Sequence, residues 1–279
     1  MLETWKWRGN PLHTTVATWN INSVRLRAHH VARFLEQWQP DVICLQETKC
    51  PEGQFPSAAF ARHGYHHIAH CAQPGYHGVA VVSRIAFDDS WSRQFCGRED
   101  ARHIAVRLAA PHKLWVHSLY VPAGGDVPDP SKNPKFAHKL SFLDELEAWL
   151  PWIRQTSDAP TILAGDLNIA PLEHDVWSHR QMLKVVSHTP IETERLTAIQ
   201  AAGQWIDVMR EHVPHDQKLY TWWSYRARDW ALADRGRRLD HIWVDPRLAG
   251  ACGSVETVRE ARGWMQPSDH VPVVARLDL

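Results

Sequence analysis

The sequence predicts an α/β protein built from mixed β-sheets with helices on the outside. Short apolar or alternating runs, bounded by Gly, Pro, Asn or Asp, recur along the chain, as is typical of strands. Helical patterns lie between only some of these runs, and residues 78–121 contain several strand-like runs with little helix between them. This mixture favours antiparallel or mixed sheets over a regular repeat of strand and helix.

Eight segments have the strand pattern, and three have apolar residues spaced three or four apart, as on one face of a helix. The predicted strands are residues 16–19, 41–45, 78–82, 104–108, 114–121, 161–163, 241–244 and 271–277. The predicted helices are residues 31–38, 136–153 and 193–202, the last of which is closed by Gly203.

The composition is that of an ordinary globular protein, with 44% hydrophobic and 22% charged residues. Lys plus Arg equals Asp plus Glu at 31 each, so any phosphate-binding surface must come from local segregation of charge. The five Cys residues include no CxxC pair. This pattern disfavours a disulfide framework and a thiolate zinc site, and fits a reducing cytosol.

The chain shows no internal repeat, low-complexity tract or linker. We therefore expect a single domain over residues 1–279, with a short N-terminal extension over residues 1–12. The first residues lack the apolar run of a signal peptide, and no apolar run approaches the ~18 residues that span a bilayer. These features predict a cytoplasmic protein that does not bind membranes, and we expect it to be a monomer.

Two predicted strands end in acidic groups suited to a hard cation. The strand at residues 161–163 continues through Gly165 into Asp166 and Asn168, whose side chains face the same way in an extended chain. A carboxylate beside an amide can hold a cation, or orient a water next to a phosphoryl oxygen. The predicted strand at residues 41–45 is followed by Glu47, whose carboxylate is a natural ligand for a hard cation. Each feature taken alone also fits a polar turn after a strand.

Other polar groups lie near the remaining strands. Asp269 and His270 precede the last strand, so a metal-binding carboxylate lies next to a group that can donate to phosphate or accept a proton. Asp240 could orient an imidazole, and a salt bridge with a neighbouring Arg is the alternative. Asn20 closes the first strand and Tyr120 another, where a turn residue and a core tyrosine are the alternatives.

One segment, residues 222–238, interleaves aromatic and basic residues. It holds five Arg against two Asp, a local excess of three positive charges, together with Trp222 and Trp223. Stacking combined with phosphate attraction is typical of DNA binding. A buried Trp pair beside a solvated, Arg-rich loop is the alternative.

The order of these motifs resembles that of the exonuclease III / apurinic-apyrimidinic (AP) endonuclease family, over nearly all of residues 14–277. The family has the endonuclease/exonuclease/phosphatase fold, so the resemblance implies a four-layer α/β sandwich, with two mixed β-sheets packed face to face between outer helices. The matching motifs are Asn20-x-Asn22, Gln46-Glu47-Thr48-Lys49, Tyr120, Gly165-Asp166-x-Asn168, Arg238-x-Asp240 and Ser268-Asp269-His270.

The resemblance also implies a metal site for Mg²⁺, which Mn²⁺ can replace because both accept hard oxygen ligands. Glu47 is expected to be the main ligand, helped by Asp269 and Asn20, and Asp166 to contact a second metal. The full set of expected metal-contacting residues is Asn20, Glu47, Asp166, Asn168, Asp269 and His270.

The catalytic roles follow from the same resemblance. Asp166 is expected to position or deprotonate the attacking water, and Asn168 to orient it. His270, held by Asp240, is expected to contact a non-bridging phosphate oxygen, and Tyr120 the scissile phosphate. The resemblance leaves open whether Asp166 or His270 is the general base.

The resemblance implies double-stranded and abasic-site DNA as partners. Trp222 and Leu239 align with positions that wall a pocket for a flipped-out abasic sugar. The expected DNA-contacting residues are Arg102, Trp222, Arg226, Arg237 and Leu239. Two residues depart from the family pattern. Ser23 stands where many relatives have Gly, and Arg237 where some have Trp.

The leading hypothesis is a DNA repair nuclease that incises 5′ to abasic sites, cleans 3′ ends and has 3′→5′ exonuclease activity on duplex DNA. One rival is a phosphodiesterase of the same fold that acts on lipid or inositol phosphates, which the aromatic and basic segment disfavours. The other rival is a DNA-binding module without catalysis, which the intact set of acidic and imidazole groups disfavours.

Overall fold

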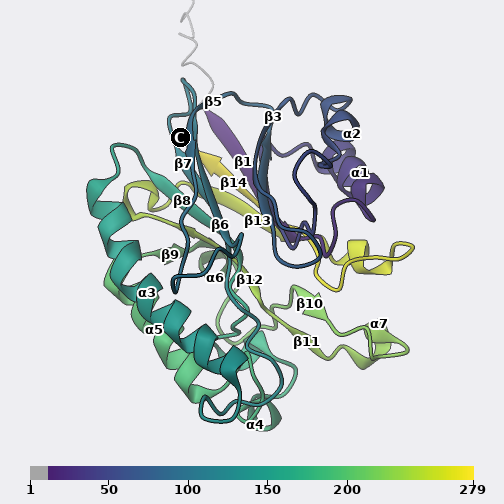
Figure 1. The fold of residues 1–279 in the computed structure, drawn as a ribbon, viewed down its shortest axis with the longest axis vertical. Helices are drawn as coiled ribbons and strands as arrows, with labels where there is room; N and C mark the ends of the chain where they lie inside the picture. Colours follow the sequence, from purple (N-terminus) through teal and green to yellow (C-terminus); the bar gives the residue numbers. More distant parts are fainter. Residues whose placement is uncertain (1–11) are drawn as a thin grey trace, which may run out of the picture.

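The computed structural model describes residues 12–279, in which two β-sheets lie face to face between layers of helices (Figure 1). Most of the expected N-terminal extension, residues 1–11, lies outside the described residues. Within the described part of the chain, no helix is long and apolar enough to cross a membrane.

The first sheet has six strands in the order β13-β14-β1-β2-β4-β3. β1 and β2 are parallel, and all other neighbours in this sheet are antiparallel. The strands are β1 (His13–Asn20), β2 (Val42–Gln46), β3 (His67–Cys71), β4 (Val79–Ser83), β13 (Cys252–Thr257) and β14 (Val273–Asp278).

The second sheet also has six strands, in the order β5-β6-β7-β8-β12-β9, with β7 and β8 parallel. A separate two-stranded ribbon joins β10 (Trp222–Trp223) to β11 (Gly236–Arg237). The strands of the second sheet are β5 (Phe87–Trp91), β6 (His103–Leu108), β7 (Trp115–Tyr120), β8 (Thr161–Asp166), β9 (Ile206–Asp207) and β12 (Asp240–Val244).

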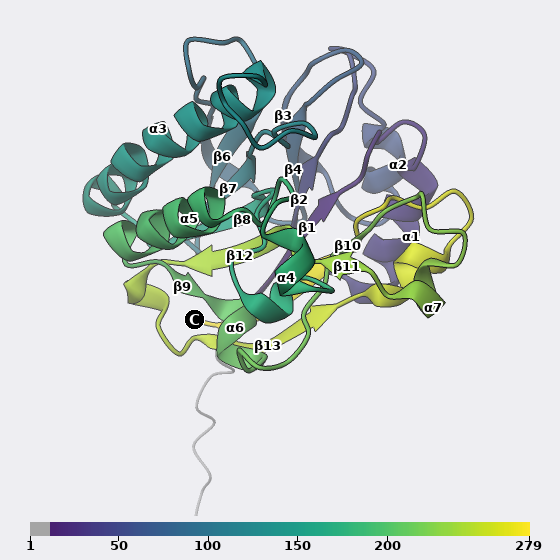
Figure 2. The same cartoon turned by 90° about the horizontal axis from the view of Figure 1, so that it is seen from below.

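Two long helices, α3 (Pro134–Thr156) and α5 (Pro190–Gly203), pack together on the outer face of the second sheet (Figures 1 and 2). α1 (Ala28–Trp38) and α2 (Ser57–Ala61) lie on the outer face of the first sheet. The remaining α-helices are short: α4 (His179–Met182), α6 (Val208–His212) and α7 (Trp230–Ala233).

Three apolar clusters fill the spaces between the four layers. The central cluster joins the inner faces of the two sheets and includes Val16 and Val42 of the first sheet and Val116 and Ile162 of the second. A second cluster packs α1 and α2 against the first sheet, and a third packs α3 and α5 against the second. The predicted four-layer sandwich with two mixed sheets is thus confirmed.

All eight predicted strands and three predicted helices are present, with shifted ends. α5 begins at Pro190, earlier than predicted, because Thr189 and Glu192 form a reciprocal cap and Pro suits the first helical position. The strands that were not predicted include β3, β5 and β13, at three edges of the two sheets. Each is only partly buried, so it lacks a continuous apolar signal.

Candidate active site

Strand register brings the predicted polar residues together at one end of the two sheets. In the first sheet, Asn20 ends β1 and Glu47 directly follows the parallel β2. In the second sheet, Tyr120 of β7 lies opposite Asp166 of β8, and Asp240 of the antiparallel β12 lies opposite Asp166 on its other side. Residues that are far apart in the sequence therefore become neighbours.

Glu47 is held by donors from both sheets. One of its carboxylate oxygens accepts hydrogen bonds from Asn20 Nδ2 and the Tyr120 hydroxyl, each at 2.9 Å. The other lies 2.8 Å from Lys49 Nζ. Burial opposes ionisation, but Lys49 and Asn20 hold the pKa of Glu47 below its usual value. Burial and the nearby carboxylates raise the pKa of Tyr120 well above its usual value, so its hydroxyl stays a neutral donor.

Asp166 is almost completely buried and fully hydrogen-bonded. Its Oδ2 accepts from Asn20 Nδ2 at 2.9 Å and from Asn168 Nδ2 at 3.1 Å, and its Oδ1 accepts from the Asn168 backbone at 2.9 Å. Burial raises the pKa of Asp166 to about 7; Asp240 and Glu47 add to the rise and His270 opposes it. A carboxylate with a pKa near neutrality is suited to accept a proton from water.

His270 bridges two of these carboxylates. Its Nδ1 lies 2.8 Å from Asp240 Oδ2, and its Nε2 lies 3.7 Å from Asp166 Oδ2. Burial alone would lower the pKa of His270, but Asp240 and Asp166 raise it to about 10. The imidazole is therefore protonated at neutral pH. An imidazolium has no free lone pair, so in this state His270 donates to anions, and the predicted contact with a metal would require loss of that proton.

The backbone at the end of β8 depends on Gly165 and Asn168. A Cβ at Gly165 would lie 1.9 Å from the Leu119 carbonyl oxygen, so only Gly permits the close approach of β7 and β8. Asn168 has a φ of 54°, in the left-handed region that Asn tolerates better than most residues. Its Nδ2 also donates to Val121 O at 2.9 Å, which links the loops after β7 and β8.

Asp269 lies at the rim of the site and is linked to Glu47 indirectly. Its carboxylate accepts from Trp222 Nε1 at 2.9 Å and from Asn22 Nδ2 at 3.2 Å. Asn22 Oδ1 in turn accepts from Lys49 Nζ at 2.6 Å. Asn22 and Lys49 belong to matched motifs, but sequence reasoning assigned them no role. Their positions became evident only from these contacts.

The side chains that converge here fit a hard cation such as Mg²⁺, which prefers carboxylate and amide oxygens. Within residues 12–279, Asp166, Asp240 and His270 form the one group of three carboxylate or imidazole side chains whose candidate ligand atoms all lie within 4.8 Å of one another. Asp240 Oδ1 is buried in this group without a hydrogen-bond partner. A bound cation would satisfy that oxygen and offset the crowded negative charge.

Asp240 pairs with His270, and the neighbouring Arg238 pairs elsewhere. The Arg238 guanidinium makes two hydrogen bonds to Asp175, at 2.8 and 3.0 Å, and one to Asp207. The alternative of a salt bridge between Asp240 and an adjacent Arg is therefore wrong. Sequence reasoning missed Asp175, since nothing near it in the chain indicates a partner 63 residues away.

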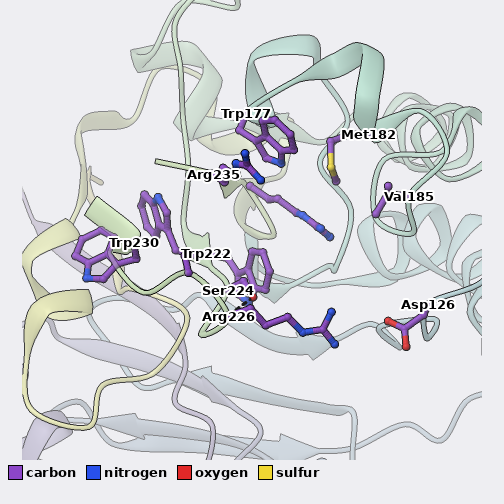
Figure 3. Close-up of a pocket in the computed structure, with 12 residues that line it drawn as sticks. Asp126, Trp177, Met182, Val185, Trp222, Ser224, Arg226, Trp230 and Arg235 are labelled. Carbon is purple, nitrogen blue, oxygen red and sulfur yellow. Dashed lines mark hydrogen bonds between the residues drawn. The ribbon is translucent and has the colours of Figure 1, made fainter. Parts of the chain in front are cut away.

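A cavity of about 590 Å³ adjoins the site (Figure 3). Three predicted DNA contacts, Trp222, Arg226 and Arg237, line it, and the Arg237 guanidinium lies 4.9 Å from the centroid of the Trp222 ring. Trp177 lines the facing wall, with Arg235 4.7 Å from its ring centroid. The cavity thus presents aromatic faces beside cationic groups, which suits bases and phosphates.

The other two predicted DNA contacts are buried. Leu239 is 4% exposed and packs in an apolar cluster with Met182. Arg102 is 5% exposed and donates to Asp100 at 3.1 Å. Its guanidinium lies 5.0 Å from the centroid of the Tyr120 ring, and it donates to the Tyr120 carbonyl at 3.4 Å. Arg102 is therefore buried against the Tyr120 ring and backbone and helps to fix their position, so it is not placed to contact DNA directly.

Ser23 stands where many relatives have Gly, but the loop after β1 is still held by a backbone hydrogen bond. Ser23 has a φ of 87°, a conformation that Gly adopts more readily. Its backbone N–H donates to the Glu47 carbonyl at 2.7 Å. The loop therefore contacts the backbone of Glu47 directly, although a Ser occupies the position.

Comparisons with known proteins agree with this geometry. Residues 17–270 match the model of the "Endonuclease/Exonuclease/phosphatase family". Exodeoxyribonuclease III of Haemophilus influenzae is 29% identical over 267 residues, which cover 92% of this chain and 97% of that protein. The structure of an AP endonuclease from Archaeoglobus fulgidus is similar with a TM-score of 0.86 at 30% identity, covering 95% of this chain and 100% of that one.

A 3′-5′ exonuclease from Neisseria meningitidis is equally similar, with a TM-score of 0.86, 30% identity and coverage of 95% of this chain and 100% of that one. The chain therefore belongs to the endonuclease/exonuclease/phosphatase family. Within that family, its resemblance to the exonuclease III / AP endonuclease group is confirmed, and the protein is a nuclease.

Proposed function

We propose that the protein is a Mg²⁺-dependent DNA repair nuclease that incises 5′ to abasic sites, removes blocking groups from 3′ ends and degrades duplex DNA from the 3′ end. The observation that carries the proposal is the Asp240–His270–Asp166 array, with distances of 2.8 and 3.7 Å. A similar Neisseria structure is described as a 3′ phosphatase bound to a product DNA hairpin, which supports activity at 3′ ends.

Asp166 is the general base in this proposal. Its pKa of about 7 lets it accept the proton of the attacking water near neutral pH, while Asn20 and Asn168 orient its Oδ2. His270, whose pKa is raised to about 10 by Asp240 and Asp166 against the effect of burial, already carries a proton. It therefore donates to a non-bridging phosphate oxygen and does not act as the base.

Glu47 would be the main ligand of the cation, helped by Asp269 and Asn20, and Asp166 would contact a second cation next to Asp240. When bound, the cation offsets the charge of the phosphodiester and stabilises the leaving 3′-oxygen. The Tyr120 hydroxyl, which reaches Glu47 at 2.9 Å, contributes a neutral donor beside the scissile phosphate. Mn²⁺ is expected to replace Mg²⁺, since the same oxygen ligands accept both.

The adjoining cavity takes the DNA. Arg226 and Arg237 supply positive charge, and Trp222 supplies an aromatic face next to the Asp269 carboxylate. A sugar without its base could enter beside Trp222, which packs on the buried Leu239, because no base would have to be accommodated there. This arrangement favours duplex DNA with an abasic site over a lipid or inositol phosphate.

A duplex that contains one abasic analogue tests the proposal, assayed with Mg²⁺ and with EDTA. We expect metal-dependent nicking 5′ to the lesion, and we expect Asp166→Asn to abolish nicking while DNA affinity stays within a few-fold, since neutral Asn cannot accept the proton. Binding without cleavage by the wild type would favour a silent DNA-binding module. Hydrolysis of lipid head groups alone would favour the rival phosphodiesterase. Undiminished nicking by Asp166→Asn would exclude Asp166 as the base.

A further inference from the structure

We propose that Lys139 is a positioning residue for the catalytic loop, residues 166–170. In this proposal the Lys139 ammonium holds the Asn168 backbone in the conformation that directs the Asn168 side chain to Asp166. Lys139 lies on α3, outside the second sheet, and is fully buried. The inference rests on the proposed function only in treating Asp166 and Asn168 as catalytic.

The Lys139 ammonium joins three parts of the chain. Its Nζ donates to the Asn168 carbonyl oxygen at 2.8 Å and reaches the Ala123 carbonyl oxygen at 3.4 Å. It also lies 2.5 Å from Glu192 Oε1 at the start of α5. All three N–H donors of the ammonium therefore have an acceptor, in the loops after β7 and β8 and in α5.

The stability gained from the Lys139–Glu192 ion pair does not explain why a charged side chain is buried at position 139. The side chains of Lys139 and Glu192 are both 0% exposed, and apolar side chains of similar volume often stabilise a fold as well as or better than a buried ion pair. Glu192 is already satisfied by the backbone N–H groups of Ser187 and Thr189 and by the Thr189 hydroxyl. What an apolar side chain at position 139 could not supply is the hydrogen bond to Asn168.

The hydrogen bond from Lys139 stabilises the Asn168 backbone in a left-handed conformation. Asn168 has a φ of 54°, a left-handed conformation that Asn tolerates better than most residues but that still costs more energy than in Gly. Its N–H is held by Asp166 Oδ1 and its Nδ2 by Asp166 and Val121, all within the loops after β7 and β8. Lys139 supplies the one hydrogen bond to the Asn168 carbonyl among the described residues, and it comes from the rigid outer helix.

The path of the Lys139 side chain is kept open by Gly124. A Cβ there would lie 2.9 Å from Lys139 Cδ and 3.0 Å from Val186 Cγ1, and Gly124 has a φ of +88°. Both space and backbone conformation therefore favour Gly at this position. This observation gives a role to the start of the loop between β7 and α3.

Two double variants isolate the hydrogen bond: Lys139→Met/Glu192→Gln and Lys139→Gln/Glu192→Gln. Both remove the ion pair and have similar volumes, but only the second retains an N–H donor at position 139. We expect the Met variant to lose about 10-fold or more in kcat with KM within about twofold, as expected for a misplaced catalytic group. It should also show faster hydrogen–deuterium exchange in residues 166–170. The Gln variant should stay within about threefold of the wild type in kcat.

Two further variants separate positioning from stability. Glu192→Gln alone leaves the Lys139 bond to Asn168 in place, so kcat should be retained even if the melting temperature falls. Leu150→Ala, three turns along α3 and buried, should lower stability without changing kcat or the exchange of residues 166–170.

Equal kcat for the two double variants, or unchanged exchange of residues 166–170 in the Met variant, would overturn the proposal. The exchange measurement needs no substrate. If the wild type failed to cleave DNA, the proposed function would therefore fail while exchange still decided the role of Lys139.

Discussion

At the scale of single residues, the site works because burial and neighbouring charges separate the protonation states of its groups. Glu47 is ionised, Tyr120 is neutral and His270 is cationic at neutral pH, while Asp166 titrates near 7. Strand ends hold these groups a few ångströms apart, so each one changes the pKa of the others. One carboxylate, Asp240, does most to keep the proton on His270.

Asp240→Asn should therefore lower the pKa of His270 from about 10, because it removes the largest favourable charge while burial remains. In the wild type, the raised pKa stabilises the fold fully below pH ~6.5, and this contribution is lost as pH rises through about 10. NMR titration of the His270 imidazole in the metal-free protein measures its pKa in the wild type and in Asp240→Asn. Loss of the charged donor should lower kcat by about 10²–10³. A wild-type His270 that titrates near its ordinary value would contradict this account.

At the scale of elements, the site is built from the ends of neighbouring strands, and two of these strands leave no room for a side chain between them. β7 and β8 are parallel neighbours that carry Tyr120 and Asp166 in register, and Gly165 of β8 leaves no room for a Cβ beside Leu119 of β7. Any side chain there would overlap with the Leu119 carbonyl, so the strands would have to separate. The placement of both proposed catalytic groups depends on this contact.

We expect Gly165→Ala to lower the free energy of unfolding by about 1–3 kcal/mol, as overpacking a tight interior does. Activity should fall as well, since Tyr120 and Asp166 would move apart. Gly263→Ala is the matched control, because a Cβ there meets nothing within 4 Å. It should change stability by no more than about 0.5 kcal/mol. Urea unfolding of both variants provides the comparison, and equal stabilities would refute the role given to Gly165.

At the scale of the whole molecule, DNA binding must come from uneven distribution of charge, because the net charge is zero. The cavity beside the site carries Arg226, Arg235 and Arg237 around its aromatic walls. Arg107, by contrast, lies at the opposite end of the second sheet, paired with Asp158 at 2.7 Å. The two ends of the sandwich should therefore contribute differently to DNA affinity.

Arg226→Ala and Arg107→Ala change the net charge equally but should affect DNA binding differently. If Arg226 contacts one phosphate, its removal should reduce the slope of log K against log salt concentration by about 1. Arg107→Ala should leave the slope unchanged. Fluorescence anisotropy with a duplex at several salt concentrations measures both, and matching slopes for the two variants would argue against the cavity as the DNA-binding surface.

Much of this protein could be predicted from its sequence, because local signals mark its inner strands and polar motifs. Apolar runs identified the buried strands and the three longest helices. Polar residues at the ends of those runs, such as Asp166 at the end of β8 and Asn168 just after it, marked strand ends that meet at one edge. The edge strands β3, β5 and β13 escaped prediction because partial burial requires no apolar pattern.

The fold class and the identity of the polar residues at the site were predictable from the sequence. The partners of those residues were not, because they depend on how the layers pack. The tertiary structure paired Asp240 with His270 and Arg238 with Asp175, placed Arg102 behind Tyr120, and brought Lys139 of an outer helix to the carbonyl of Asn168. Burial of a strand or helix and its backbone conformation can be predicted from the spacing of apolar residues and from the turn residues next to it. Contacts between side chains tens of residues apart depend on how the layers pack, which no local pattern encodes.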